Sequence, residues 1–260
     1  MLGMTAQWMG IMGEHANSVA PLLVSTEQGY LKSTFCKSLL PAALQRYYMD
    51  KVDLTSEGRV ERRLAEMGLL NLDEFDKYPP TKMPLLKNLM QMASLSLCKA
   101  YQKNHRSLPR IASFIGTSNR KELLTDPTGS RRFICVMVKR PIDCNGIEHK
   151  QIYAQLKAEI LSGERYWFTK EEEQVLQKNN LSFYRQGPVE DVLRSCYRSV
   201  EKGEEGELRS AAEIFQCLKK KNPSAMRGAN PASLAQILVA VGIERKHTKF
   251  GNVYRVVKIG

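Results

Sequence analysis

A lysine followed by two hydroxyl residues, Lys32-Ser33-Thr34, stands at the expected start of a helix. An apolar run, 21–25, and a tight turn, 26–31, come directly before it. In such a layout the backbone amides at the helix start face phosphates, the lysine pairs with the β- and γ-oxygens, and the serine hydroxyl ligates Mg²⁺. We therefore expect a site for ATP and Mg²⁺. Its expected residues are Gln28, Gly29, Lys32, Ser33 and Thr34.

A second segment, about forty residues further on, supplies the complementary acids. The apolar residues 69–72 read as a strand and are followed by Asp73 and Glu74. Acids at the end of an apolar strand cost desolvation unless they serve a metal or a partner. Asp73 can hold the metal through water, and Glu74 can polarise the water that attacks the γ-phosphate. Together the two segments predict a site for nucleotide hydrolysis.

The loop departs from the usual pattern G-x-x-x-x-G-K-[ST] at both glycines. Thr26 stands at the first glycine position and Leu31 at the second. Glycine is favoured there because the backbone takes unusual dihedral angles and the phosphate approaches closely. A leucine at position 31 still fits if its φ is negative, but it would narrow the loop. On the loop alone, a strand, a turn and a helix with an exposed Lys-Ser-Thr is an open alternative, and the Asp73-Glu74 pair favours the nucleotide site.

Composition points to a globular protein with a polyanionic partner. The 260 residues allow one large domain and a small one, and 43% hydrophobic with 25% charged residues is ordinary for a folded chain. The net charge of +12 is unusual. It indicates nucleic acid, DNA or RNA, as the leading partner and an anionic membrane surface as the lesser one. No run of 18 apolar residues is present, so we expect no membrane span.

The cysteines indicate a reduced, cytoplasmic protein. There are six, widely spaced and without a C-x-x-C pair, and the four histidines are scattered as well. This spacing predicts neither a zinc site nor a disulfide framework. The N-terminus also lacks the basic start and apolar core of a signal peptide.

Apolar strands alternate with helices through the first 185 residues. This alternation is typical of an α/β domain with a mainly parallel sheet flanked by helices. Thr169 is expected to cap the last of these helices, because three glutamates follow in its first turn. The expected strands are 22–24, 69–72, 110–119 and 132–138, and the expected helices are 7–16, 33–44, 57–67, 83–97 and 165–180.

The chain changes character at a polar, glycine-containing stretch, 201–206. Beyond it, residues 207–260 hold ten Lys or Arg against three acids. Expected helices at 207–220 and 231–241, followed by a basic hairpin, give the outline of a winged-helix module. A small appendage that only packs on its parent domain is the alternative. We expect three parts: 1–185 as an α/β domain, 186–206 as a linker or helical connector, and 207–260 as the winged-helix-like domain.

Five motifs of the chain carry a family resemblance. They are Gln28-Gly29-x-x-Lys32-Ser33-Thr34-Phe35, Leu72-Asp73-Glu74-Phe75-Asp76, Phe114-Ile115-Gly116-Thr117-Ser118-Asn119, Leu124 to Phe133, and Trp167 to Glu173. Together they resemble the virulence-associated protein E family, P-loop proteins of phage and mobile elements related to superfamily 3 helicases. The resemblance covers residues 5 to 185 and implies an AAA+/helicase-like P-loop fold. The C-terminal part looks like the domain of unknown function that follows such modules in Bacteroides-type proteins.

Three further residues have a reason to join the site. Asn119, at a strand end beside the Asp-Glu strand, can orient the attacking water or sense the γ-phosphate; a side chain that caps the next turn is the alternative. Arg131 and Arg132 follow a Gly-Ser turn and, without the family, read as a solvated strand start. The resemblance implies that one of them reaches a neighbouring subunit's γ-phosphate, since adjacent strand residues face opposite ways. It therefore implies a homo-oligomer, with a hexamer as the related assembly.

Two basic patches are expected to contact nucleic acid. The first lies where relatives place a substrate-facing hairpin, and its tyrosine would stack on bases while its cations bind phosphates. The second belongs to the basic C-terminal hairpin. Their residues are Lys99, Tyr101, Lys103 and Arg106, and Arg245, Lys246 and Lys249.

The sequence thus predicts an ATP-hydrolysing, helicase-like motor that acts on nucleic acid in mobile-element or phage replication. Many relatives carry a primase-like region upstream, which implies a primase-like domain or protein as a partner. A decayed P-loop scaffold that binds nucleic acid without turnover is the alternative, and its best evidence is Thr26 and Leu31. A nucleotide-gated switch with very slow turnover is a third interpretation.

Overall fold

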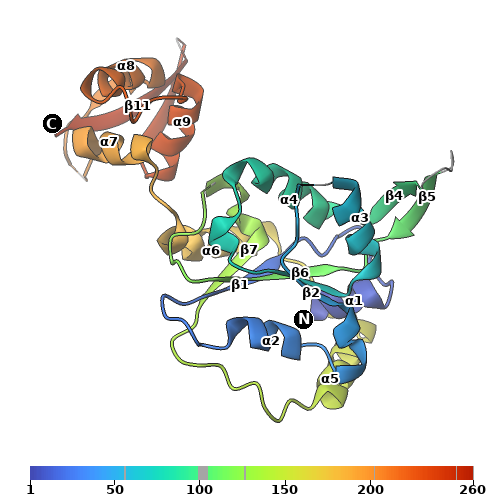
Figure 1. Ribbon diagram of the computed structural model, residues 1–260. Helices are drawn as coiled ribbons and strands as arrows, with labels where there is room; N and C mark the ends of the chain where they lie inside the picture. The colour runs from blue at the N-terminus through green and yellow to red at the C-terminus, as the bar shows by residue number, and fades with distance from the viewer. Residues whose placement is uncertain (56, 99–104, 126, 202, 250, 260) are drawn as a thin grey trace. The chain divides into compact units, whose positions relative to one another are not determined.

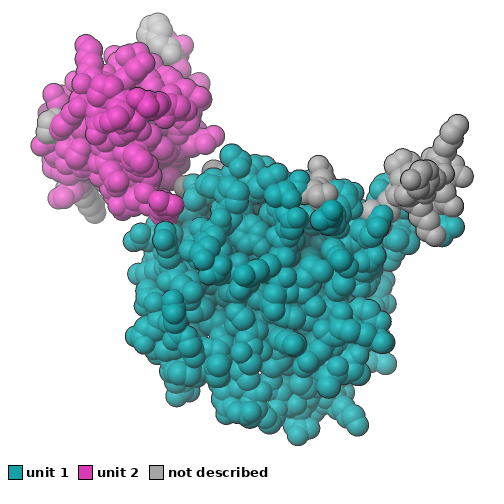
Figure 2. Space-filling view, in the orientation of Figure 1, with its two compact units in different colours: residues 1–184 teal, residues 185–260 magenta. Residues whose placement is uncertain are grey.

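The chain forms two compact units in a computed structural model that describes residues 1–55, 57–98, 105–125, 127–201, 203–249 and 251–259. Unit 1 spans Met1–Tyr184 and unit 2 spans Arg185–Gly260 (Figure 2). Each unit has a hydrophobic core of its own. No helix in the described part of the chain is long and apolar enough to cross a membrane.

Unit 1 is built on a five-stranded sheet with the order β2-β3-β6-β1-β7. Every neighbouring pair in this sheet is parallel, which confirms the predicted α/β class. The carboxyl ends of all five strands therefore meet at one edge, where ligands bind in open α/β sheets. The strands are β1 (Ala20–Val24), β2 (Tyr48–Asp50), β3 (Leu69–Leu72), β6 (Ser113–Ser118) and β7 (Phe133–Met137).

Helices cover both faces of this sheet (Figure 1). Because successive strand residues point to opposite faces, Leu22 and Phe114 join one core while their neighbours Leu23 and Ile115 join the other. The first core also takes in α3 (Glu57–Glu66) and α4 (Met83–Gln91), and the second takes in α1 (Leu2–Trp8), α2 (Lys32–Ser38) and α5 (His149–Leu161). The sheet is thus buried on both sides, which explains its continuous apolar strands.

The central strand, β6, passes close to both of its neighbours at Gly116. A Cβ atom at this position would lie 2.5 Å from Cδ2 of Leu22 on β1 and 3.2 Å from the carbonyl oxygen of Leu72 on β3. A side chain there would overpack the sheet at the level of the candidate site. Gly116 therefore allows β1, β6 and β3 to bring their carboxyl ends together.

Arg110, just before β6, is a buried structural cation. It is 3% exposed, and burial lowers its pKa to about 10. Its guanidinium donates to four backbone carbonyl oxygens, so every acceptor is a neutral peptide group. These belong to Met92 (2.6 Å), Ala112 (2.8 Å), Asn17 (2.8 Å) and Met90 (3.1 Å). The arginine thereby ties the end of α4 to the start of β6.

The helix α6 (Lys170–Asn180) begins as predicted, at a capping box. The Thr169 hydroxyl accepts from the Glu172 amide, and the Glu172 carboxylate accepts from the Thr169 amide. The expected start at residue 165 was too early, because Thr169 is extended. At its other end, the buried Asn180 amide donates to the carbonyl oxygens of Ser130 and Phe133, which fixes the approach to β7.

Three predicted helices have different bounds. The helix expected at 7–16 is α1, Leu2–Trp8, and Gly10 follows it with φ 68. The helix expected at 33–44 ends at Ser38, and Pro41 precedes a 3₁₀ helix, Ala42–Tyr47. The helix expected at 83–97 ends at Gln91. The residues after it alternate Leu-Ser-Leu and form β4 (Ser94–Cys98), which pairs with β5 (His105–Pro109).

Unit 2 combines helices with a small antiparallel sheet. Its central strand, β11, pairs with β8, β9 and β10. The segment 186–206, expected as a linker or helical connector, contributes the helix α7 and the strand β8 to this unit, and residues 207–210 form a strand where we expected a helix. The elements in order are α7 (Pro188–Cys196), β8 (Tyr197–Ser199), β9 (Glu207–Ser210), α8 (Ala211–Lys221), α9 (Pro231–Ala240), β10 (Glu244–Thr248) and β11 (Gly251–Lys258).

Candidate nucleotide site

Three segments with polar side chains meet at the carboxyl edge of the unit 1 sheet. The loop 25–31 follows β1, Asp73 and Glu74 follow β3, and Thr117 and Ser118 end β6, with Asn119 directly after them. Since β6 lies between β1 and β3, its polar end stands between the loop and the acidic pair. The topology thus brings together residues that are up to 87 positions apart in the chain.

Asp73 joins the helix after the loop to the central strand. The Ser33 hydroxyl donates to Asp73 Oδ1 at 2.9 Å, and the Thr117 hydroxyl donates to the same oxygen at 2.6 Å. The sequence placed Ser33 and Asp73 on one metal, and the structure holds their oxygens side by side. Thr117 was not predicted as a site residue. Its signal was a hydroxyl at the buried end of an apolar strand.

Lys32 is a buried cation at the base of the loop. The residue is 7% exposed, and its ammonium donates to Asn119 Oδ1 at 2.8 Å. Burial lowers the pKa of Lys32, and the charge of Asp73 opposes that shift. A cation held this deep gains from an anionic ligand, because burial weakens its solvation. Asn119 is therefore placed beside Lys32, at the strand end where the sequence predicted it.

The loop is closed by two residues in the left-handed conformation. Gly29 has φ 81, where glycine is free of steric cost. Leu31 has φ 57 and ψ 25, so it lacks the negative φ at which a leucine fits without strain. Leu31 takes the backbone conformation that a glycine would take, at a cost of about 1–2 kcal/mol. The other loop residues of the predicted site, Gln28 and Thr34, are exposed at the surface.

The strain at Leu31 can be measured with two variants. Leu31→Gly and Leu31→Ala both remove the exposed side chain, but only glycine adopts a positive φ without steric cost. We expect Leu31→Gly to have the higher free energy of unfolding, by about 1 kcal/mol. Urea unfolding monitored by circular dichroism gives this difference. An alanine variant as stable as the glycine variant would contradict the left-handed conformation.

Glu74 is paired with a lysine that the sequence analysis missed. Glu74 Oε1 lies 2.6 Å from Lys77 Nζ, and this contact raises the pKa of Lys77. The Glu74 backbone is also left-handed, with φ 53, and its amide donates to the Thr117 hydroxyl at 3.4 Å. The signal was the i,i+3 spacing of the acid and the lysine. Lys77 thus holds the carboxylate that we assigned to the attacking water.

Arg131 and Arg132 lie at the opposite edge of the sheet. They end a 3₁₀ helix, Pro127–Arg132, directly before β7, so they do not start a strand as predicted. Phe133 pairs with Ala20, the first residue of β1, while the loop follows Val24, the last. Four strand steps of about 3.3 Å separate the two levels, roughly 13 Å along the strands. These arginines therefore stand away from the candidate site of their own chain.

Arg131 forms an ion pair at that edge. Its Nη1 lies 3.2 Å from Glu173 Oε2 on α6. Both arginines line a cavity of about 310 Å³ together with His15 and Trp167, whose rings stack with centroids 4.2 Å apart. The structure thus gives the two arginines a common, solvent-accessible setting.

The predicted nucleic-acid residues fall into three groups. Lys99, Tyr101 and Lys103 lie outside the described residues. Arg106 is exposed on β5 of unit 1. Arg245, Lys246 and Lys249 are exposed in unit 2, the first two on β10 and the third directly after it.

The donor set at the carboxyl edge fits magnesium. Mg²⁺ prefers hard oxygen ligands and is held in nucleotide sites by one or two protein oxygens together with phosphates and waters. Ser33 and Asp73 offer such oxygens 2.9 Å apart. In the described residues no group of three or more His, Cys, Asp or Glu side chains is arranged to hold a metal.

The fold is that of an α/β protein with a parallel sheet flanked by helices, and its candidate site has the layout of a phosphate-binding loop. A Lys-Ser-Thr segment follows its first sheet strand, an Asp-Glu pair follows β3, and the strand between them ends in Thr-Ser, with Asn119 directly after it.

Family comparison agrees with this class. The virulence-associated protein E-like domain matches residues 15–185, and the chain belongs to that family. Residues 186–256 match a domain of unknown function from B. Theta. Both matches confirm the resemblance inferred from the motifs, and no curated protein matches the chain.

Solved structures of the NrS-1 C-terminal region are similar to the chain over most of its length. Its apo structure, residues 305–718, has 12% sequence identity and a TM-score of 0.42, and the match covers 99% of this chain and 71% of that one. An A-form apo structure of the same region has 13% identity, a TM-score of 0.39 and the same coverage.

Proposed function

We propose that the chain is a magnesium-dependent ATPase of the helicase-like class that acts on nucleic acid. The observation that carries this proposal is the convergence of Lys32, Ser33 and Asp73 at the carboxyl edge of the sheet. These three residues come from separate segments and match the lysine, hydroxyl and acid that a nucleoside triphosphate with Mg²⁺ requires. Gln28, Gly29 and Thr34 complete the phosphate loop in this proposal.

Each residue has a separate task. Lys32 neutralises the β- and γ-phosphate oxygens, and Asn119, which already accepts its hydrogen bond, keeps the ammonium aimed at them. Thr117 orients Asp73. Glu74 accepts a proton from the attacking water once its carboxylate is released from Lys77. Ser33 and Asp73 would hold magnesium, which would supply charge neutralisation on the phosphates.

The positions of the two arginines favour a homo-oligomer in this proposal. Because Arg131 and Arg132 lie at the amino edge of the sheet, they would reach the nucleotide of a second copy rather than that of their own chain. A heterologous contact that repeats in this way builds a ring where its rotation closes and a filament where it does not, and the proposal takes a homo-oligomer such as a hexamer.

Nucleic acid is the partner that the charge supports. The chain carries +12 at neutral pH, and cations are exposed on both units. Arg106 in unit 1, with Lys99, Tyr101 and Lys103 beside it in the sequence, and the basic hairpin of unit 2 are the proposed contacts. Membership of the virulence-associated protein E-like family favours a cytoplasmic task in replication of a phage or mobile element, beside a primase-like domain or protein.

One observation favours a second candidate, a scaffold that binds nucleic acid without turnover. Thr26 and Leu31 replace both loop glycines, and Leu31 keeps the left-handed conformation only at a steric cost. A loop that still has to accept a phosphate is expected to keep the left-handed backbone at position 31 even where leucine replaces glycine. We therefore rank the ATPase first.

ATP turnover by the full chain, measured with and without DNA or RNA, tests the proposal. A motor is expected to hydrolyse Mg-ATP and to do so several-fold faster with its nucleic acid, because binding completes the catalytic arrangement. Nucleic-acid binding with no turnover under any of these conditions would favour the scaffold.

A further inference from the structure

We infer that unit 2 grips the phosphate backbone of duplex nucleic acid with its β10–β11 hairpin and does not read base sequence with α9. The inference rests on the nucleic-acid partner of the proposed function and assigns that contact to one part of the domain of unknown function. It also predicts that binding is independent of sequence.

The order of elements gives unit 2 two ways to meet a duplex. Helices α8 and α9 are followed by the antiparallel hairpin β10–β11, and β9 closes the sheet on the other side of β11. In helix-turn-helix modules the second helix enters the major groove, where its side chains reach base edges. By position, α9 is that helix and the hairpin is the alternative contact.

The composition of α9 does not suit the major groove. Its sequence is PASLAQILVA, without a charged residue. Leu234 and Leu238 are buried in the unit 2 core, and Ser233 is engaged with Asn230 in the capping box. Gln236 remains as the one exposed polar side chain of the helix, beside Val239, which is 49% exposed. An inserted α9 would bring no cation to the phosphates and a single amide to the bases.

The β10–β11 hairpin, unlike α9, carries exposed cations. Arg245, Lys246 and Lys249 are exposed on β10 and at the tip. Two contacts hold that tip in place, His247 Nδ1 to Asn252 Oδ1 at 3.0 Å and the Thr248 hydroxyl to the Gly251 carbonyl oxygen at 2.9 Å. Cations on a held hairpin lose less side-chain and backbone entropy on binding.

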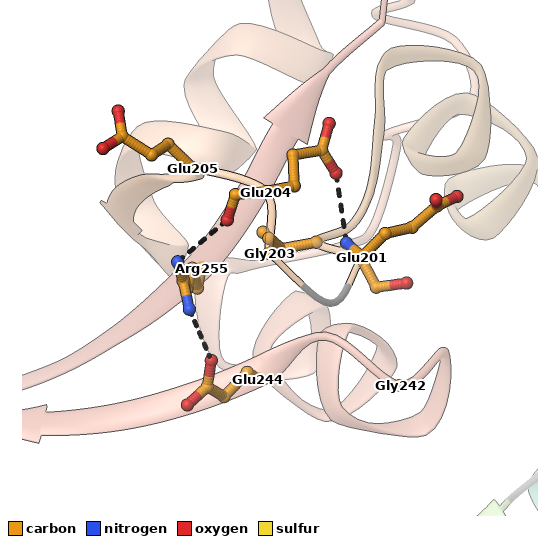
Figure 3. A pocket seen from close by; sticks show the side chains of 9 residues that line it. Glu201, Gly203, Glu204, Glu205, Gly242, Glu244 and Arg255 are labelled. Carbon is orange, nitrogen blue, oxygen red and sulfur yellow. Dashed lines mark hydrogen bonds and ion pairs between the residues drawn. The ribbon is translucent and has the colours of Figure 1, made fainter.

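Acidic residues lie at the open end of the hairpin, away from the tip, and favour approach of nucleic acid to the tip. A pocket of about 590 Å³ there is lined by Glu201, Glu204, Glu205 and Glu244 (Figure 3). Arg255 is used within it, since it lies 3.8 Å from the Glu244 carboxylate and donates to the Glu204 carbonyl oxygen at 3.0 Å. Phosphates are repelled from this end and attracted to the tip.

A duplex fits the hairpin better than a single strand. Single strands are bound by stacking bases on exposed aromatic rings. In the described part of the hairpin, residues 244–249 and 251–258, the ring of Tyr254 is 3% exposed, and the exposed ring of His247 is engaged with Asn252. Phe250 lies outside the described residues. In this described part, exposed cations without an exposed and unengaged aromatic ring suit a continuous phosphate backbone.

The test compares two triple variants of the full chain that lose the same charge. One is Arg245→Ala with Lys246→Ala and Lys249→Ala. The other is Lys219→Ala with Lys220→Ala and Lys221→Ala, in the exposed last turn of α8. Fluorescence anisotropy is measured at several salt concentrations with two duplexes of unrelated sequence and with a single strand. A third variant, Gln236→Ala, tests α9.

We expect the hairpin variant to bind duplex roughly 10- to 100-fold more weakly. The slope of log K against the logarithm of the salt concentration should become less steep by about two to three. The α8 variant and Gln236→Ala should change affinity less than about 3-fold, and the two duplexes should bind alike. Three outcomes would overturn this inference alone. They are equal losses of duplex affinity in both triple variants, a preference for one duplex that Gln236→Ala removes, and tighter binding of the single strand. No binding of any nucleic acid by the wild type would overturn the nucleic-acid partner as well, whereas a chain that binds through the hairpin and does not hydrolyse ATP would leave this inference standing.

Discussion

Glu74→Gln is expected to keep Mg-ATP binding and to lower ATP turnover by about 10²- to 10³-fold. Glutamine has the shape of glutamate but cannot accept the proton of the attacking water. Glu74 follows β3 next to Asp73, with its amide bonded to Thr117, so the exchange leaves the metal ligands in place. Steady-state phosphate release, together with nucleotide binding by calorimetry, separates the chemical step from affinity.

Glu122→Gln is the matched control, since Glu122 is an exposed acid in unit 1 after β6. It should turn over ATP as the wild type does. If Glu74→Gln also kept full turnover, Glu74 would not be the base. If it lost nucleotide binding, its task would be structural instead.

Arg131→Ala and Lys32→Ala are expected to be nearly inactive alone and partly active when mixed. An arginine that reaches a neighbouring subunit's γ-phosphate contributes about 10³-fold or more to turnover. A mixed assembly contains interfaces in which an intact Lys32 loop from one copy meets an intact Arg131 from the next. Random mixing makes about a quarter of the interfaces complete, so turnover should recover to about that fraction.

The same experiment with Arg132→Ala identifies which arginine is needed. Glu173→Gln is the control, because it removes the ion-pair partner of Arg131 and leaves both guanidinium groups intact. Mixed oligomers shown by sedimentation, with turnover no higher than in the separate variants, would contradict a site shared between subunits. Wild-type turnover in both Arg131→Ala and Arg132→Ala would exclude an arginine finger here.

Much of the sheet was predictable because its strands combine short apolar runs with polar ends. β3 was predicted at its observed bounds, and β1, β6 and β7 within a few residues. The convergence of Lys32, Ser33, Asp73 and Asn119 followed from one rule, that parallel strands end at a common edge. These four side chains meet once the strands that precede them are neighbours in the sheet.

The parts that could not be predicted depend on tertiary context. The positive φ of Leu31 is imposed by the closure of the loop, and leucine itself disfavours it. Residues 94–97 were assigned to the end of the expected helix 83–97, yet residues 94–98 pair with β5 and form a strand. The edge on which Arg131 and Arg132 lie was not visible from their Gly-Ser turn, because only the register of β7 against β1 reveals it.

The segment 186–206, expected as a linker or helical connector, shows the same limit of local sequence patterns. Its glycines and charges are typical of a hinge, but Val192, Leu193, Cys196 and Tyr197 just before them are buried in the unit 2 core. The strand β8 then pairs with β11, sixty residues further on, at a distance in sequence that local patterns do not report.

The most direct test of the central claim is Mg-ATP binding by calorimetry to the wild type, Lys32→Ala and Lys37→Ala. Lys37 is an exposed lysine on the same helix, α2, and serves as the matched control. The account predicts saturable binding to the wild type and to Lys37→Ala, and at least about 100-fold weaker binding to Lys32→Ala, because a buried phosphate contact is lost. No binding at millimolar ATP by the folded wild type, or equal binding by Lys32→Ala, would contradict it.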